Sequence, residues 1–377
     1  MKILFIGARL FDDVDFYLKE KKIESIVTES NENSINLNLP DYKYIVPRGM
    51  DEPLNIAREE SVDGIISLIG IDDPLMEVAI AKEKSEKNLN IPFIASNTNV
   101  ISISSDKIKT KEFFIENNIE TPNYNIISSD FSFDDIHYPV VLKQRRGQGG
   151  RDIIVAKNFN EANEYFLKFG EILCEEFIEG SEISIEVLGF NGGYMPLVPV
   201  YKGETTFEGI HPLNKVRSAP ADIKGLDNED LRNIALKIAK SLKAEGIIDI
   251  DFIFSKKDNK LYALEINTRP SGTRYLTAAT SGIHPLTKLI DMISGEFDVN
   301  SLKNEIKDYF ALEIPIRNYS GPKSEEPQKK FTKNSWIVHG PSNYKRLTIS
   351  GESKEKTLEL AKYLLVDKFD DFDLEEL

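Results

Sequence analysis

The amino-acid sequence predicts an α/β protein of more than one domain, and three observations lead to that prediction. The chain has 377 residues, which is more than one ordinary hydrophobic core organises. Its N-terminal part alternates short apolar strands with helical stretches, a pattern typical of a parallel sheet. Further along, residues 246–267 form two apolar runs in which acids recur with period two, as in a pair of antiparallel strands.

The N-terminal alternation indicates a substrate-binding sheet edge. Ligands of parallel sheets bind beyond the carboxyl ends of the strands, so the loops after Gly7 and Gly70 are candidate substrate walls. Arg9, Asp72 and Asp73 are available there, although they also fit an ordinary polar surface. Gly7 lacks the further glycines of a dinucleotide-binding motif, which argues against a nicotinamide cofactor. Strands are expected at 2–7, 24–28, 44–46, 64–69 and 91–95.

The composition restricts the partners and the compartment. There are 47 Lys and Arg against 62 Asp and Glu, so the net charge of −15 opposes binding to nucleic acid or to an anionic membrane. The single cysteine, Cys174, excludes an intramolecular disulfide and fits a reducing compartment. The N-terminal apolar run is too short for a signal peptide and no run reaches membrane-spanning length, so a cytoplasmic location is expected.

The acid-bearing strands predict a magnesium site. Pairing Ser255 with Leu261 would set the polar residues of the two strands opposite each other. Facing carboxylates repel, and a divalent cation would remove the repulsion by taking their oxygens as ligands. Carboxylate and amide oxygens suit Mg²⁺, which also uses substrate phosphates. The alternative is a solvated acidic face. The predicted pairs are Asp251 with Glu265 and Asp249 with Asn267.

A glycine-rich loop follows a buried strand that carries Lys143 near its end. The loop, residues 145–151, combines arginines with Gly147, Gly149 and Gly150. It does not end in Gly-Lys-Ser/Thr and does not open a helix, so it is not a Walker A loop. Its glycines still allow backbone N–H groups to approach a phosphate closely. A flexible hairpin loop without a ligand is the alternative.

Two further segments are predicted to flank these motifs. A helix begins after Ser105 or Asp106, either of which can cap it, and carries Lys107 in its first turn. A strand at 172–177 is followed by the sequence Ile-Glu-Gly-Ser-Glu and a second strand. From Lys303 onward the pattern changes to a polar, proline-bearing stretch and then a small α/β unit.

Four pieces in this order resemble the ATP-grasp superfamily. They are Asp106-Lys107, Lys143 with residues 147–150, residues 175–182, and Asp251 with the run Glu-Ile-Asn-Thr-Arg-Pro at 265–270. The branch they resemble most contains carbamoyl-phosphate-synthetase-like ligases, biotin carboxylase and amino-acid ligases. The resemblance covers roughly residues 1–300. It implies a Rossmann-like substrate domain over 1–104, an ATP-grasp domain over 105–300 with a lid at about 122–185, and a C-terminal appendage over 301–377.

The resemblance also implies ligands for ATP, residue by residue. In the family, lysines of the Asp-Lys motif and of the lid strand contact ATP, and the glycine-rich loop covers the β- and γ-phosphates. The hinge strand offers backbone groups to adenine, and a carboxylate shortly after it holds the ribose; Glu182 matches best, with Glu179 a rival. The matching ATP-binding residues are Lys107, Lys143, Gly147, Gly149, Gly150, Glu175, Glu176, Phe177, Ile178 and Glu182.

The same resemblance implies the metal ligands and the catalytic cations. Asp251, Glu265 and Asn267 match the ligands of Mg²⁺, which Mn²⁺ could replace. Arg269 matches an arginine that holds the acyl phosphate or tetrahedral intermediate. Lys215 and Arg217 lie in a region that contacts the substrate carboxylate in relatives. Biotin carboxylase differs after Arg-Pro and has a longer C-terminal region, so it is the less similar member.

The function expected is ATP-dependent joining of a carboxylate to an amine through an acyl phosphate, with amino acids as the first choice of substrate. Two alternatives stay open: a related enzyme that uses bicarbonate or another acceptor, and a nucleotide-binding protein without turnover. The intact metal set argues against the last. Small-molecule carboxylate and amine substrates are the expected partners, with a homodimer possible.

Overall fold

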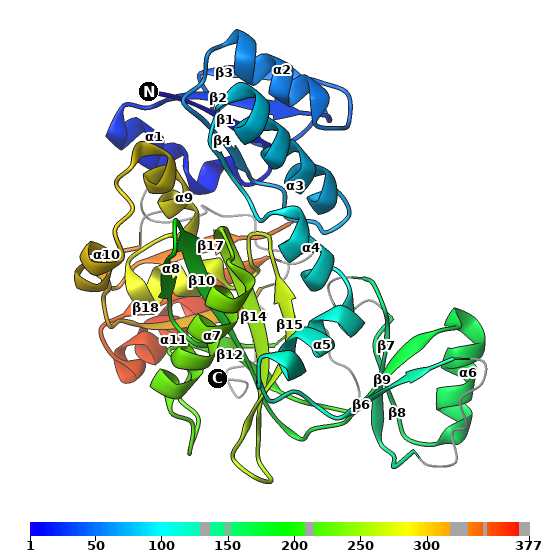
Figure 1. Cartoon of the computed structure of the whole chain (residues 1–377). Helices are drawn as coiled ribbons and strands as arrows, with labels where there is room; N and C mark the ends of the chain where they lie inside the picture. Colours follow the sequence, from blue (N-terminus) through cyan, green and yellow to red (C-terminus); the bar gives the residue numbers. More distant parts are fainter. Residues whose placement is uncertain are drawn as a thin grey trace.

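Three sheets and the helices between them form the molecule in the computed structural model (Figure 1). The N-terminal lobe lies at the top of Figure 1, a large sheet forms the body, and a small sheet projects to the right. The structure describes residues 1–128, 136–147, 150, 152–207, 215–316, 331–341 and 345–368.

The N-terminal lobe is a parallel sheet in the order β3-β2-β1-β4-β5. Its central strands are apolar and buried, as expected of strands covered on both faces. The strands are β1 (Lys2–Ile6), β2 (Glu24–Glu29), β3 (Tyr42–Ile45), β4 (Gly64–Ser67) and β5 (Phe93–Ile94). The helical segments are η1 (Phe11–Asp13), α1 (Asp15–Lys21), α2 (Asp51–Glu59), α3 (Leu75–Lys84), the π-helical η2 (Ser85–Leu89) and α4 (Thr98–Ser104).

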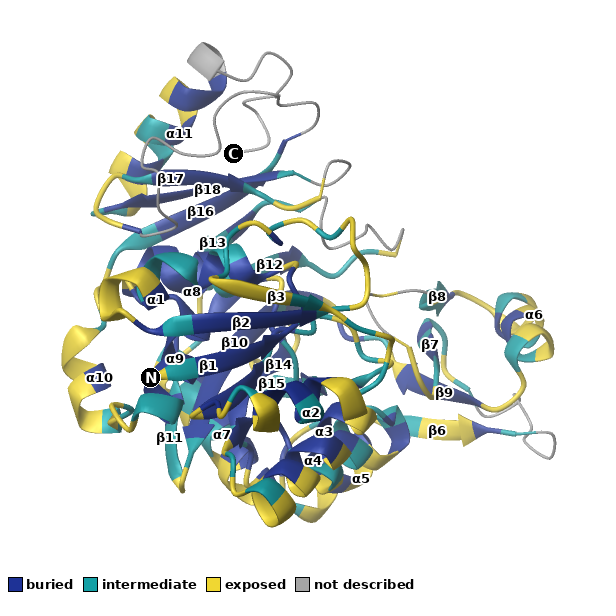
Figure 2. Cartoon of the chain, turned by 90° about the horizontal axis from the view of Figure 1, so that it is seen from above, coloured by how far each residue is buried: buried dark blue, intermediate teal, exposed yellow. Residues whose placement is uncertain are grey.

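The projecting unit is an antiparallel sheet in the order β6-β9-β7-β8 with one helix on it. In Figure 2 it stands apart from the body, and its edge strand β6 is largely exposed. It is reached from the lobe through α5 (Lys107–Glu116), whose N-cap is Asp106, one of the two predicted caps. The elements are β6 (Tyr124–Ile127), β7 (Val140–Gln144), β8 (Ile154–Ala156), α6 (Phe159–Phe169) and β9 (Ile172–Glu176).

The body is a nine-stranded sheet in the order β15-β14-β10-β12-β13-β16-β18-β17, with β11 beside β10. Its long strands β10 and β14 are buried almost throughout (Figure 2). The strands up to the hairpin are β10 (Gly180–Phe190), β11 (Gly193–Pro196), β12 (Val200–Glu204), β13 (Arg217–Ala219), β14 (Gly246–Ser255) and β15 (Leu261–Asn267). The helices that pack on this sheet are α7 (Asn228–Leu242), α8 (Arg274–Ser281) and α9 (Pro285–Ser294).

The C-terminal strands continue the large sheet. β13 pairs with β16 in the register Arg217 to Glu313, so the segment expected as an appendage shares backbone hydrogen bonds with the body. An apolar cluster that includes Leu312, Trp336 and Leu364 packs the last helix onto these strands. The elements are α10 (Val299–Glu305), β16 (Phe310–Pro315), β17 (Trp336–His339), β18 (Arg346–Gly351) and α11 (Lys354–Lys368).

The hairpin of β14 and β15 has the predicted pairs of polar residues, but its register next to the turn differs from the predicted one. Leu261 pairs with Phe254 rather than with Ser255, so the expected register is wrong by one residue near the turn. A β-bulge beyond Phe252 inserts one extra residue in β15 and shifts the register back. Asp251 therefore lies opposite Glu265 after all, and Asp249 opposite Asn267.

Among the described helices, none combines the length and the apolar character needed to cross a membrane.

Candidate active site

The acidic hairpin and the neighbouring strand β10 form the floor of the candidate site. In β10, Ser184 lies opposite Asp251 and Glu186 opposite Asp249, so four polar side chains occupy one face of two adjacent strands. All four are buried. Burying carboxylates in this way is costly unless cations balance them.

Two lysines from distant segments supply part of that balance. Lys202 Nζ lies 2.6 Å from Asp251 Oδ1, and Lys107 Nζ lies 3.8 Å from Glu265 Oε2. Burial, together with Asp249 and Glu265, nevertheless raises the pKa of Asp251 to about 7. Burial would also raise the pKa of Glu265, but Lys107 and its neighbouring lysines lower it to about 2. Of this pair, Glu265 is therefore firmly ionised, whereas Asp251 has too little positive charge near it to balance its own charge.

The donor set fits a magnesium ion bound together with a nucleotide. Nowhere in the described residues do three or more His, Cys, Asp or Glu side chains gather as they do in an all-protein metal site. Mg²⁺ usually takes one or two carboxylates and completes its shell with substrate phosphates and water. Asp251 and Glu265 offer two carboxylates on facing strands, and the Nδ2 of Asn267 lies 3.4 Å from Glu265 Oε1. The underneutralised Asp251 is the observation that favours a cation at this position.

Lys143 is held by a buried carboxylate within the projecting unit. Its Nζ lies 2.7 Å from Glu175 Oε2, and Lys111 Nζ lies 3.1 Å from Glu175 Oε1. Burial by itself would raise the pKa of Glu175, but the two lysines keep this pKa below its ordinary value. Burial lowers the pKa of Lys111 to about 8. Glu175 therefore shares its charge between two lysines rather than facing the nucleotide site alone.

The described part of the glycine-rich loop contacts the first turn of α5. Lys107 Nζ donates to the Gly147 carbonyl at 2.9 Å, and the Lys107 N–H donates to the Arg145 carbonyl at 3.0 Å. Gly147 has a backbone φ of +137° and Gly150 a φ of +71°, and residues other than glycine rarely adopt these backbone conformations. Lys107 thus lies between the loop and Glu265. Gly149 lies outside the described residues.

The predicted adenine and ribose residues lie where the chain passes from β9 of the projecting unit to β10 of the body. Glu176 is exposed and accepts from Asn123, Ile178 is buried, and the Phe177 ring stacks on Phe207 with centroids 4.7 Å apart. Glu182, at the start of β10, accepts from Lys215 Nζ at 3.2 Å. The predicted ribose carboxylate and the predicted substrate lysine thus form an ion pair with each other.

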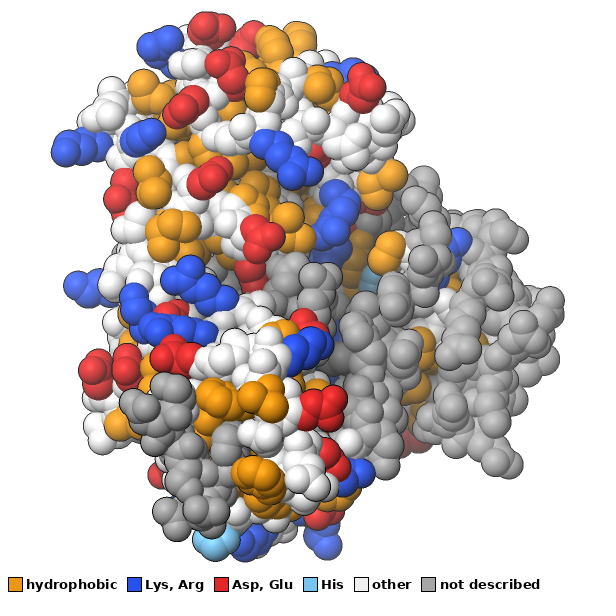
Figure 3. All heavy atoms as spheres, turned by 90° about the vertical axis from the view of Figure 1, so that its right-hand side faces the viewer, with side chains coloured by type: hydrophobic (Ala, Val, Ile, Leu, Met, Phe, Trp, Pro, Cys, Tyr) orange, Lys and Arg blue, Asp and Glu red, His pale blue; other side chains and the backbone are white. Residues whose placement is uncertain are grey.

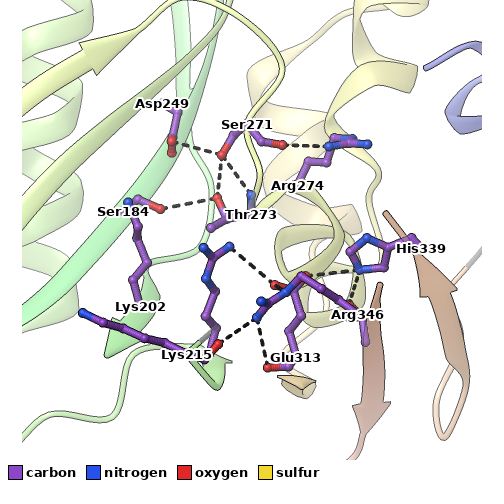
Figure 4. A network of polar contacts seen from close by, with 12 residues as sticks. Ser184, Lys202, Lys215, Asp249, Ser271, Thr273, Arg274, Glu313, His339 and Arg346 are labelled. Atoms are coloured by element: carbon purple, nitrogen blue, oxygen red, sulfur yellow. Dashed lines mark hydrogen bonds and ion pairs between the residues drawn. The ribbon is translucent and has the colours of Figure 1, made fainter. Parts of the chain in front are cut away.

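Arg217 is bound to the C-terminal strands rather than left free in the site. Its Nη1 lies 3.5 Å from Glu313 Oε1, and Arg346 also binds that carboxylate. His339 Nε2 lies 3.2 Å from Glu313 Oε2. Arg346 further donates to the Lys215 carbonyl at 2.9 Å. Figure 4 shows Glu313 among these groups, with Lys215 on one side and His339 on the other.

Arg269 connects the hairpin to the N-terminal lobe. Its Nε binds Asp72, in the loop after β4, and its Nη2 donates to Asn267 Oδ1 at 3.4 Å. Residues Ser67, Ile69, Thr268 and Pro270 line the crevice between these segments. The loop after Gly70, a predicted substrate wall, therefore meets the predicted acyl-phosphate arginine.

Sequence reasoning missed three charged residues that complete this arrangement: Lys111, Lys202 and Glu313. Lys111 lies four residues after Lys107 on α5, a helical spacing that places both on one face. Glu313 is an acid embedded in the apolar strand β16, the same signal that identified the hairpin acids. Lys202 had no comparable local signal, because only the pairing of β12 with β10 brings it to Asp251.

Comparison with known proteins agrees with this geometry. The ATP-grasp domain family matches residues 104–273. A protein of Methanobrevibacter smithii named carbamoyl-phosphate synthase is 54% identical over 94% of this chain and 98% of its own length. The carbamoyl phosphate synthase large chain of Clostridium perfringens is 25% identical over 71% of this chain, which spans about a quarter of that relative (25%).

Solved structures show the same fold at low sequence identity. The biotin carboxylase domain of Hydrogenobacter thermophilus 2-oxoglutarate carboxylase, a dimer bound to MgADP and bicarbonate, has a TM-score of 0.74 at 20% identity, covering 97% of this chain and 89% of that one. The L-amino acid ligase of Bacillus licheniformis has a TM-score of 0.70 at 20% identity, covering 97% of both chains.

The family match and the relatives show that this chain is an ATP-dependent ligase. The chain belongs to the ATP-grasp superfamily, in the family of the Methanobrevibacter smithii protein named carbamoyl-phosphate synthase. ATP-grasp folds bind ATP with Mg²⁺, as the MgADP complex of the Hydrogenobacter domain illustrates.

Proposed function

We propose that this enzyme uses ATP to phosphorylate a one-carbon carboxylate, bicarbonate or carbamate, as a carbamoyl-phosphate synthase does. The observation that carries the proposal is the identity of 54% along nearly the whole length of a relative with that name. The expectation of amino-acid substrates has less support than this proposal, because the likeness to the L-amino acid ligase extends only to the fold. The large-chain relatives are several times longer than this chain, so their full reaction is not transferred to it.

The proposed first step transfers the γ-phosphoryl group of ATP. A carboxylate oxygen forms a bond to the γ-phosphorus, the bond to the ADP oxygen breaks, and an acyl phosphate results. Such a transfer needs positioned cations more than covalent help from the protein. In this scheme Lys107 on α5 and Lys143 on β7 would hold the phosphates, and Arg269 would hold the acyl oxygens; their ion pairs with Glu265, Glu175 and Asp72 support this assignment. When bound at Asp251, Glu265 and Asn267, Mg²⁺ would neutralise charge on the transferred group.

When bicarbonate is the carboxylate, the proposed second step forms a C–N bond, whereas the carbamoyl phosphate formed from carbamate would already be the product. An amine nitrogen attacks the acyl carbon, the bond to the phosphate oxygen breaks, and inorganic phosphate leaves. The glycine-rich loop would exclude water from the acyl phosphate, which water would otherwise hydrolyse. Mn²⁺ could replace Mg²⁺ in this scheme. A homodimer is compatible with it, as in the dimeric Hydrogenobacter domain.

Steady-state ADP release tests the proposal. With Mg·ATP and ammonia, we expect release that requires bicarbonate and saturates with its concentration. Hydroxylamine should trap an activated carboxyl group under the same conditions. Release that ignores bicarbonate but responds to a particular amino-acid carboxylate would contradict the proposal and favour amino-acid ligation. Nucleotide binding without ADP release under any of these conditions would contradict both.

A further inference from the structure

Lys202 reaches the acidic hairpin from within the large sheet. It lies in β12, which is separated from β14 by β10. Gly203 pairs with Glu182 of β10, but Tyr201 already pairs with the next residue of that strand, so Lys202 is the extra residue of a β-bulge. Gly203 has a φ of +105°, a backbone conformation that few other residues adopt. Bulges of this kind redirect side chains and are common beside active sites.

The ammonium group of Lys202 binds one oxygen of Asp251. Nζ donates to Oδ1 at 2.6 Å, and only 15% of the lysine side chain and 12% of the aspartate side chain are exposed. In Figure 4, Lys202 lies on the same side of the network as Ser184 and Asp249, away from Glu313. Lys and Arg side chains also gather at the surface where the N-terminal lobe meets the rest of the molecule (Figure 3). Water and salt screen charges at such a surface, but they screen a mostly buried pair much less.

The contact of Lys202 differs from that of the lysine beside Glu265. Lys107 lies 3.8 Å from Glu265 and makes a shorter contact, of 2.9 Å, with the Gly147 carbonyl. Lys107 belongs to α5 and Gly147 follows β7 of the projecting unit, so both lie outside the large sheet. Lys202 and Asp251 are held in strands of one sheet, and their contact therefore does not depend on the position of the projecting unit.

This contact limits how a metal ion can use Asp251. A carboxylate has two oxygens, and a carboxylate that bridges two metal ions uses one oxygen for each. With Oδ1 bonded to the ammonium group, Asp251 offers Oδ2 to one ion. A second divalent ion at Oδ1 would meet the positive charge of Lys202 at close range. Lys202 balances one of the two negative charges of Asp251 and Glu265, so a single Mg²⁺ leaves an excess of positive charge for the phosphates.

We propose that Lys202 is a resident cation of the proposed metal site. It neutralises Asp251 at the position where a second metal ion would otherwise bind, so the site takes one divalent ion together with the nucleotide. Lys202 is then a positioning residue, which acts on the phosphates through Asp251 and the metal ion. This inference rests on the proposed function, since it concerns the metal ion of the same ATP-dependent reaction.

Counting the metal ions bound to the wild-type protein tests the inference without turnover. Mn²⁺ is titrated into protein that is in excess over β,γ-methylene-ATP, an analogue that cannot transfer its γ-phosphoryl group, and free Mn²⁺ is measured by electron paramagnetic resonance. We expect one tightly bound Mn²⁺ per nucleotide. Two ions whose affinities differ by less than about 10-fold would overturn the inference, because Lys202 would then not exclude the second ion.

Three variants assign the metal count to the charge of Lys202. Lys202→Met should let a second Mn²⁺ bind about 10-fold or more tightly than it binds to the wild type, because the repelling charge is removed. Lys202→Arg keeps the charge and should still bind one ion. Lys19→Met removes a lysine that binds Asp15 at 2.7 Å on the exposed side of α1, and this matched control should behave as the wild type. An unchanged affinity for the second ion in Lys202→Met would contradict the inference.

ADP release separates this inference from the proposed function. Lys202→Met should release ADP slowly at a Mg²⁺ concentration that saturates the wild type, and about 10-fold more Mg²⁺ should restore part of the rate by filling the second position. A merely structural role would give a rate that added Mg²⁺ does not raise, and that result would overturn the inference. Should Lys202→Met fail to fold, the metal counts of the wild type and Lys202→Arg decide. Release that ignores bicarbonate, with the expected metal counts, would overturn the proposed function alone.

Discussion

Two buried acidic centres on the same large sheet differ in how fully their charge is balanced. Glu313, in β16, is completely buried and contacts Arg217, Arg346 and His339. Burial opposes its charge, but these cations hold the pKa of Glu313 far below its ordinary value. Asp251 in the hairpin has one close cation, Lys202, and its pKa is raised instead.

The difference separates a supporting centre from a binding centre. A carboxylate surrounded by protein cations has no need of an external one, so Glu313 joins the C-terminal strands to β13. A carboxylate pair with too few cations leaves room for a metal ion and phosphates. Sequence reasoning treats the two alike, as acids inside apolar strands, because the pattern does not show which cations arrive from elsewhere.

The largest effect is expected when the charge of Glu313, the supporting centre, is removed. Glu313→Gln leaves two buried arginines without their shared anion, and we expect a loss of about 3–5 kcal/mol in the free energy of unfolding. Urea denaturation is the measurement. Glu229→Gln, which breaks an exposed pair with Arg232, is the control and should cost about 1 kcal/mol or less. Similarly small losses of unfolding free energy in both variants would show that Glu313 contributes little to the stability of the fold.

The next effect concerns the binding centre. Glu265→Gln should reduce ADP formation about 10²–10³-fold, because an oriented charge at the transferred phosphate is removed. The carboxyl pattern alone suggests relief of repulsion, but the surrounding lysines lose their partner, so a slightly lower melting temperature is expected. Turnover is measured across a range of Mg²⁺ concentrations, with Glu229→Gln on the exposed surface of α7 as control. Wild-type turnover at ordinary Mg²⁺ would remove the metal site from the hairpin.

A smaller effect distinguishes the two lysines that share Glu175. Lys143→Met should weaken ATP binding by about 1.5–3 kcal/mol, the value of a charge-assisted contact. Lys111→Met removes the other partner of Glu175, and we expect it to lower stability more than ATP affinity. Nucleotide titration and thermal unfolding of both variants provide the measurement. Equal losses of ATP affinity would show that Lys143 acts through Glu175 and not on the phosphates.

The smallest effect depends on pH. Burial and the facing Asp249 raise the pKa of Glu186 to about 8, against the opposing influence of Thr277 and Arg274. The folded protein keeps this proton while the unfolded chain loses it near pH 4.5, so wild-type stability from this group falls as pH rises toward 8. Glu186→Gln cannot ionise, and its stability relative to wild type should increase between pH 5 and pH 8.5.

Urea midpoints at the two pH values check this expectation. Asp258→Asn, on the exposed turn, is the control, because hydrogen bonds from Tyr262 and Ser255 lower the pKa of that carboxyl below its ordinary value. A difference between Glu186→Gln and wild type that is the same at both pH values would contradict a shared buried charge on β10 and β14.

Local patterns predicted much of the fold and the floor of the site. Period-two alternation identified the hairpin and its four polar residues, since side chains of a strand alternate between faces whatever the strand packs against. Capping chemistry placed the start of α5 after Ser105 or Asp106, of which the structure uses Asp106, and the glycine pattern marked the loop at 145–151. These features depend on neighbours in the sequence, so the sequence by itself determined them.

The tertiary structure alone decided which charges meet. Near the turn the strand register differs by one residue from the predicted register, and the bulge in β15 restores the predicted pairs further along the hairpin. Strand pairing brought Lys202 to Asp251 across 49 positions. The junction of β13 with β16 brought Glu313 to Arg217 across 96 positions, and Arg9 came to lie against Gly70. Such contacts depend on sheet order and domain packing, which no local period encodes. Because the charge balance of the site is a sum over these distant neighbours, the sequence could name the acids but not their partners.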